Sequence, residues 1–263
     1  MAAARWVTTA IAAVAGLLLL ASCTWAPVNR PSDETPNAGI GVPDTRIRQS
    51  TIVKPPEGVV ATGAFVSGDP TIGGSIAITS DGSDFFVDLS QAELSGMEHP
   101  LIGLADAVLA VGDCLGESAQ ATMENTEELP FLHGGFEGDP SFFSTAVIVE
   151  YDSATADCNR RIIAAAPLVW TMPDLRPDLV VTDRGESAGA NGVLDAANGR
   201  PRTYATAAGD NLEAIATRFG ITIDELNWLN PCRPGVYTRS EAYAGEVLNL
   251  DKALRGARLP QLA

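Results

Sequence analysis

The side chains that most often perform catalysis are scarce and scattered in this sequence. It has two histidines, His99 and His133, and four cysteines. A hydrolytic zinc site needs several His and carboxylate ligands, which two distant histidines without a neighbouring ligand pattern do not supply. A Cys–His nucleophile needs a base beside its thiol, and residues 112–115 around Cys114 place none there. Neither a G-x-S-x-G elbow nor a phosphate-binding loop occurs. The sequence therefore predicts no metal and no cofactor.

Paired carboxylates are the catalytic arrangement that stays open, because a glycosidase needs only two of them. Glu124, Glu127 and Glu128 form the densest acidic cluster. A run of this kind is more typical of a solvated loop. Residues 133–136, His-Gly-Gly-Phe, also have the composition of a flexible loop and contain a lone histidine. We therefore predict a protein without catalytic residues and keep a carboxylate-based glycan hydrolase as the alternative.

The composition favours a small-residue-rich fold with connectors. The chain has 263 residues, 46% of them hydrophobic but only 6% aromatic, with 25 glycines and 17 prolines. This balance is typical of β or α+β domains and not of a large helical bundle. The formal net charge is -16 and no basic cluster reverses it locally, so nucleic acid is excluded as a partner.

The first 22 residues have the layout of a secretory signal. Arg5 provides a positive start, residues 7–20 are apolar, and small residues precede Cys23. The apolar run is too short for a stable transmembrane helix. The segment Leu20-Ala21-Ser22-Cys23 resembles the lipobox of bacterial lipoproteins. That resemblance implies cleavage before Cys23, lipidation of Cys23, and a position on the extracytoplasmic face of the cell membrane.

Residues 23–59 are predicted to be the lipidated cysteine and a flexible tether. The tether holds six prolines and no periodic apolar pattern. About 36 residues span on the order of 30 Å as a coil and about 110 Å when extended. As an alternative for its end, Ile47 and Ile52–Val53 could add an edge strand to the next domain.

Residues 60–182 are predicted to form a mostly-β central domain. Residues 75–79 alternate in polarity, and Asp81-Gly82 provides a tight turn before residues 85–89. Residues 145–151 and 161–170 are two further apolar runs that predict a second hairpin.

Two features of the central domain are less regular. Residues 100–111 favour a helix, with Leu101, Leu104, Ala105 and Val108 on one face, while a strand over 107–111 stays open. Cys114 and Cys158 are expected to pair, because thiols outside the membrane tend to be oxidised. Cys232 is then left over, either as a buried thiol or as the partner of one of the other cysteines. Residues 63–65 and 74–78 are weakly similar to the opening of DM13-like β-sandwich domains, which are suspected of electron transfer.

Residues 183–202 are predicted to be a linker, with a short strand over residues 192–194 left open. A sharper pattern follows in residues 203–250, the C-terminal module. Residues 203–206 predict a strand, and Asp210 with Glu213 predicts a helix N-terminus. The apolar positions Leu212, Ile215, Ala216 and Phe219 share one helical face, and Gly220 can end that helix. Thr222 and Glu225 predict a second helix, and residues 245–250 a closing strand. The predicted class is α+β, with a small β-α-α-β module.

The module resembles the LysM family, which binds N-acetylglucosamine of peptidoglycan or chitin. The resemblance rests on Tyr204, residues 209–212, Ile215-Ala216, residues 219–221, Glu225-Leu226, residues 229–231 and residues 245–248. It implies a shallow groove between two walls. The glycan-binding residues that it implies are Gly209, Asp210, Asn211 and Leu212 in the first wall and Leu229, Asn230 and Pro231 in the second. Residues 232–244 are longer than the family's usual turn, so they either extend or cover the groove.

The expected protein is a lipid-anchored accessory or scaffold that reaches into the cell wall. Its expected partners are the membrane, through Cys23, and the glycan strands of peptidoglycan. An envelope protein that binds the central domain is a further expected partner. Residues 251–263 form a C-terminal tail. A third hypothesis is a redox or solute-binding central domain that uses the module for its location.

Overall fold

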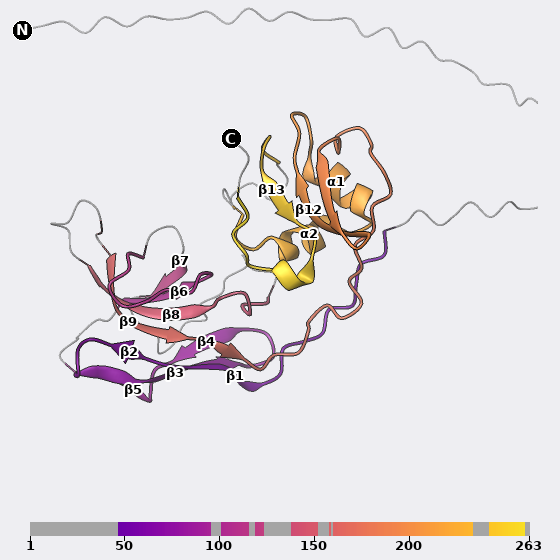
Figure 1. Ribbon diagram of the computed structural model, residues 1–263. Coiled ribbons are helices and arrows are strands. Elements are labelled where there is room, and N and C mark those ends of the chain that lie inside the picture. The colour runs from indigo at the N-terminus through magenta and orange to yellow at the C-terminus, as the bar shows by residue number, and fades with distance from the viewer. Residues whose placement is uncertain are drawn as a thin grey trace, which may run out of the picture. The chain divides into compact units, whose positions relative to one another are not determined.

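The computed structural model describes residues 47–95, 101–115, 119–123, 138–151, 158, 160–233 and 242–260. Cys23, the clustered glutamates and both histidines lie outside these ranges. Residues 45–263 form one compact unit. Its strands form three antiparallel sheets, accompanied by two α-helices, so the predicted mostly-β, α+β class is confirmed (Figure 1). No helix within the described ranges is long and apolar enough to cross a membrane.

Two five-stranded sheets make a sandwich over the predicted central domain. The first has the order β10-β1-β3-β4, with β5 also paired to β3, and the second has the order β2-β9-β8-β6-β7. The bounds are β1 Gly58–Ala64, β2 Val66–Ser67, β3 Ile72–Ser80, β4 Phe85–Asp88, β5 Ala92–Leu94, β6 Leu101–Ala105, β7 Ala119–Met123, β8 Thr145–Tyr151, β9 Arg160–Pro167 and β10 Val169–Trp170.

Side chains from both sheets meet in one apolar core. Ile78 and Phe85 from the first sheet and Ile102 and Ile148 from the second belong to the same buried cluster. Successive residues of a strand point to opposite faces, so every second residue of β3 from Ile76 onward is buried. The expected hairpins are confirmed: β3 pairs with β4 across a turn in which Gly82 has a φ of 90°, and β8 pairs with β9.

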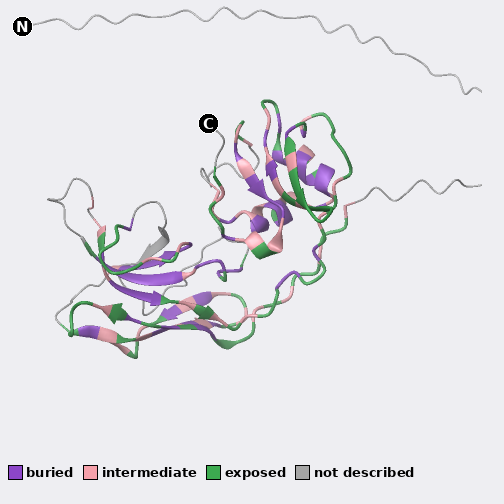
Figure 2. Ribbon diagram, in the orientation of Figure 1, coloured by how far each residue is buried: buried purple, intermediate pink, exposed green. Residues whose placement is uncertain are grey.

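The predicted helix over residues 100–111 is wrong. Residues 101–105 form β6, which pairs with β8 on one side and β7 on the other, and the strand does not extend over 107–111. The sheet is covered on both faces at β6, so four of its five residues are buried (Figure 2). A strand buried on both faces reads as a continuous apolar run, which periodicity alone does not separate from a helix.

A second, smaller core covers the outer face of the second sheet. Leu115 packs there with Val147, Val149 and Ile162. The approach is close, because a Cβ added to Gly103 would lie 2.9 Å from a methyl carbon of Leu115. Leu115 directly follows Cys114, so the loop that supplies it is held by the disulfide described below.

The C-terminal module has the expected order of elements. The strands are β11 Val193–Ala197, β12 Arg200–Ala205 and β13 Val247–Asn249, the helices are α1 Leu212–Phe219 and α2 Ile223–Leu229, and the 3-10 helix η1 spans Lys252–Leu254. β12 pairs with β11 and with β13. Eight of the twenty residues expected to be a linker are therefore sheet, because β11 and the first three residues of β12 lie before residue 203 and pair with each other.

The helix ends follow the sequence signals with one correction. Gly220 ends α1 with a φ of 71°, and Thr222 with Glu225 forms the expected capping box of α2. The cap of α1, however, is Asn211, whose side chain accepts from the N–H of Ala214, and not Asp210. Asp210 is unavailable as a cap because its carboxylate is bonded inside the module.

The C-terminal tail joins the module to the sandwich. The Arg255 guanidinium lies 4.5 Å from the ring centre of Trp228 and 5.3 Å from that of Phe142. It also donates to the backbone oxygens of Trp228 and Asp139 and pairs with the Asp139 carboxylate at 3.2 Å. Trp228 Nε1 donates to the same carboxylate. Trp228 of α2 is thus held by contacts to Arg255 of the tail and to Asp139, which precedes β8 of the sandwich.

Candidate functional site

The carboxylate of Asp210, a residue expected in the first groove wall, is hydrogen-bonded to other residues of the module and its flanking segment. It accepts from the Tyr204 hydroxyl at 2.6 Å and from the N–H groups of Asn191, Gly192 and Ala207 at 2.8 to 3.1 Å. Burial by itself would raise the pKa of Asp210, but these hydrogen bonds outweigh it and hold the pKa below its usual value. Asp210 therefore positions β12 and the preceding segment, and its oxygens do not face a ligand.

The turn at residues 187–190 contacts the first wall at Asn211. The N–H of Asn211 donates to the Gly189 backbone oxygen at 2.9 Å, and a Cβ on Gly189 would lie 2.4 Å from the Asn211 side-chain nitrogen. Leu212 is fully buried in the module core. Gly209, with a φ of 87°, has open space around its Cα. Of these four residues, only Gly209 and Asn211 are exposed, and the Asn211 side chain is engaged as the cap of α1.

The second predicted wall lines a cavity. Leu229, Asn230 and Pro231 border a space of about 230 Å³, whereas none of the first-wall residues borders it. Its lining comes from the end of α2, from β13 and from the tail: Leu229, Asn230, Pro231, Cys232, Arg233, Glu246, Val247, Asn249, Gly256, Ala257, Arg258 and Leu259. The structure thus brings the second wall together with the tail and not with the first wall.

Two polar pairs shape this cavity. The Asn230 side chain donates to the backbone oxygens of Leu226 and Asn249 and accepts from the Asn249 N–H, which ties the end of α2 to β13. Arg233 and Glu246 form a largely buried ion pair at 2.6 Å across the start and end of the 232–244 insert. Both ends of the insert are therefore held at the cavity, and residues 234–241 lie outside the described part.

The remaining thiol, Cys232, sits at the cavity beside a buried carboxylate. Burial raises the pKa of the Cys232 thiol, and the neighbouring Asp106 charge raises it further. Arg258 pairs with Asp106 at 2.8 Å. A raised pKa favours the protonated thiol at neutral pH, and the thiolate is the nucleophilic form of cysteine. No cluster of His, Cys, Asp or Glu in the described ranges could hold a metal ion.

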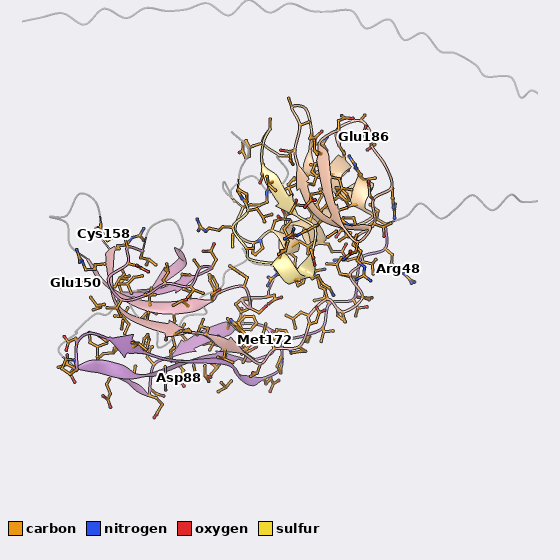
Figure 3. All side chains as sticks on the ribbon, viewed as in Figure 1. Arg48, Asp88, Glu150, Cys158, Met172 and Glu186 are labelled. Atoms are coloured by element: carbon orange, nitrogen blue, oxygen red, sulfur yellow. A yellow bond between two sulfur atoms is a disulfide. The ribbon has the colours of Figure 1, made fainter. Side chains whose placement is uncertain are left out.

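The predicted disulfide is confirmed. Cys158, labelled in Figure 3, is bonded to Cys114 with a Cα–Cα distance of 5.6 Å. Cys232 is a free thiol.

The tail is the part of the site that sequence reasoning missed. Arg255 and Arg258 follow Lys252 at three-residue spacing in a chain that is otherwise acidic, which is a signal of a paired basic strip. Their partners Asp106, Asp139 and Asp174 are distant in sequence, so the pairing itself is not readable from it.

A second cavity, of about 280 Å³, lies beside the two helices of the module. Its lining combines Glu213, Ala216 and Thr217 of α1 and residues 221–224 with Ile47, which precedes the sandwich by eleven residues. The end of the predicted tether thus contributes to a surface of the module.

Comparisons with known proteins return nothing. No family model matches the chain, and neither the curated proteins nor the solved structures contain a significant match to it.

Proposed function

We propose that this protein is an extracytoplasmic lipoprotein, anchored through Cys23, whose C-terminal module binds N-acetylglucosamine of peptidoglycan without catalysis of its own. The observation that carries the binding proposal is the cavity of about 230 Å³ beside Leu229, Asn230 and Pro231. Those three residues are the ones in which the LysM-like motif expects the second groove wall.

The lining of the cavity suits an acetamido sugar. Pro231 and Val247 offer apolar surface for a methyl group or a ring face, whereas Leu229 behind them is fully buried. Ligand sites are mostly apolar with a few placed polar groups, and here Arg233 and Glu246 lie at the rim already paired. A neutral ligand is favoured, because the charges at the rim compensate each other.

The roles of Asp210 and Asn230 change under this proposal. Both side chains are engaged in the module itself, so they act as positioning residues. The tail takes the place of the first wall, because residues 256–259 border the cavity opposite the end of α2.

The distribution of charge supports the module, and not the sandwich, as the wall-facing part. Residues 58–170 hold 17 Asp and Glu against 2 Arg, whereas residues 183–260 hold 10 against 9 Lys and Arg. A surface of one sign is repelled by a polymer of the same sign. The nearly neutral region can approach an anionic wall more closely than the acidic sandwich can.

The proposal is tested by retention of residues 24–263 on purified peptidoglycan. Ala257 is exposed and borders the cavity, so Ala257→Trp should fill it and reduce retention at least about tenfold, or about 1.4 kcal/mol. Ala253→Trp, on the exposed side of η1, is the matched control and should bind like the unchanged protein.

Retention no greater than that of an unrelated acidic protein would contradict glycan binding. Equal retention of the two Trp variants would contradict the assignment to this cavity. Zymography on the same wall material tests the hydrolase alternative, since a cleared zone would show catalysis.

A further inference from the structure

The segment just before the sandwich is hydrogen-bonded to residues that come much later in the chain. Residues 47–53, which we name the strap, form no strand, yet three of their backbone N–H groups donate to other segments. Ser50 donates to Glu225 at 2.5 Å, Thr51 to Asp178 at 2.9 Å, and Val53 to the backbone oxygen of Leu175 at 2.8 Å. Arg48, labelled in Figure 3, marks the strap in the view with side chains.

The contact with Glu225 is part of a buried charged group. Glu225 and Arg176 are 1% and 2% exposed, and their charged atoms lie 3.9 Å apart. Glu225 also accepts from the N–H and the hydroxyl of Thr222 in the capping box of α2. A buried carboxylate is costly unless its oxygens are hydrogen-bonded, so Ser50 supplies a donor that α2 needs.

The second contact, between Thr51 and Asp178, consists of two hydrogen bonds. Asp178 accepts from both the N–H and the hydroxyl of Thr51, each at 2.9 Å. Arg176 donates to the Ser50 hydroxyl at 3.4 Å. We name residues 171–192, between β10 and β11, the connector. The consecutive residues Ser50 and Thr51 of the strap therefore contact both α2 and the connector.

The direct connection from the strap to α2 does not pass through the sandwich. Its first strand begins at Gly58, after the strap, and its last, β10, ends at Trp170, just before the connector. β1 and β10 are antiparallel neighbours, with Ala61 opposite Trp170. The chain thus enters and leaves the sandwich at one edge of one sheet, next to the strap and the connector.

We infer that the strap fastens the tether directly to the C-terminal module, so that residues 24–46 alone set the spacing between the lipid anchor and the wall-binding module. The part of this inference that concerns the anchor rests on the proposed function, whereas the fastening does not. A flexible chain of that length would span on the order of 25 Å as a coil and about 70 Å when extended. The sandwich then adds nothing to the distance between the lipid anchor and the C-terminal module.

The inference is tested by placing one flexible insert at two positions of residues 24–263. A Gly-Ser insert of about 20 residues goes either before Ile47 or after Pro56, and dyes at residue 24 and at the exposed turn residue Asn198 report their separation by energy transfer. The insert before Ile47 should lengthen this separation by about 10 Å, whereas the insert after Pro56 should leave it unchanged.

A released strap should remove the difference between the two inserts. Ser50→Pro with Asp178→Ala removes the donor to Glu225 and the acceptor for Thr51, so the insert after Pro56 should then also lengthen the separation. Asp69→Ala is the matched control, because Asp69 likewise accepts from the N–H and the hydroxyl of one threonine, Thr71, on the surface of the sandwich.

Equal lengthening by both inserts in the otherwise unchanged protein would overturn the inference. The measurement contains no wall material, so a failure to bind peptidoglycan leaves it intact. Conversely, loss of the strap leaves the retention test of the cavity able to succeed.

Discussion

The sandwich and the C-terminal module are held together by different kinds of contact. The core shared by the two large sheets consists of aliphatic and aromatic side chains. The module also has an apolar core, but a network of hydrogen bonds runs through it, with Asp210, Tyr204 and Arg218 on one side and Asn230 with Asn249 on the other. Small domains bury a smaller fraction of their surface, so a fully satisfied polar network helps to specify a single structure.

The comparison predicts different weaknesses. Apolar truncation should harm the sandwich most, and loss of a single polar atom should harm the module most. Four changes, taken from the largest expected effect to the smallest, test this difference between the two regions.

Phe85→Ala should be the most damaging of them. Phe85 is 1% exposed in the sandwich core, and removing a buried phenyl ring typically costs about 4 kcal/mol of unfolding free energy. Amide hydrogen exchange should accelerate in β4 and β8 and stay slower in α1. Equal acceleration of exchange in both regions would show that the sandwich and the module unfold together, which would contradict the expected difference between them.

Removal of the disulfide with Cys114→Ser and Cys158→Ser should destabilise the sandwich by about 3 kcal/mol. The bond closes a loop with a sequence separation of 44 and holds the segment that places Leu115 over the second sheet. Chemical denaturation checks the effect, with Cys232→Ser as the control that removes a sulfur without removing a cross-link. Equal loss in the control would contradict it.

Asp210→Asn should lower the stability of the module by about 2 kcal/mol and leave the sandwich unchanged. An amide keeps the shape but turns one acceptor into a donor, which then faces the N–H groups that the carboxylate accepted from. Protection of amides in α1 and β11 is the measurement. Asp195→Asn, on the exposed face of β11, is the control, and similar behaviour of the two variants would refute the network argument.

Acid should weaken the module by a smaller and graded amount. Although burial opposes it, hydrogen bonding lowers the pKa of Asp210, and a hydrogen bond from Arg218 lowers that of Asp183. Because both folded pKa values lie below the unfolded value of about 3.9, this stabilisation is present above that pH and is lost as the pH falls through the folded pKa values. Unfolding titrations between about pH 2 and 6 check the slope. The slope should flatten in Asp210→Asn, and an unchanged slope would contradict the assignment.

Local signals in the sequence predicted the elements of the module well. Gly220, Thr222 and Glu225 end one helix and begin the next as expected, because capping involves groups only a few residues apart. The tight turn at Gly82 was predictable for the same reason.

The failures all involve a distant partner. β6 had the apolar content of a helix, and only its pairing with β7 and β8 makes it a strand. Asp210 had the position of a cap, but the residues that bond it include Asn191 and Gly192, in a segment that was expected to be a linker. No local pattern distinguishes a carboxylate that caps from one that accepts across a fold.

For this protein, the sequence by itself predicted the turn at Gly82, the end of α1 at Gly220, the capping box of α2 and the pairing of Cys114 with Cys158. Only the tertiary structure decided which of the expected groove residues border a cavity, which carboxylates the C-terminal residues pair with, and that residues 47–53 bond to later parts of the chain. The reason is physical: caps and turns depend on atoms within a few residues, whereas Ser50 meets Glu225 and Arg258 meets Asp106 only after the chain has folded.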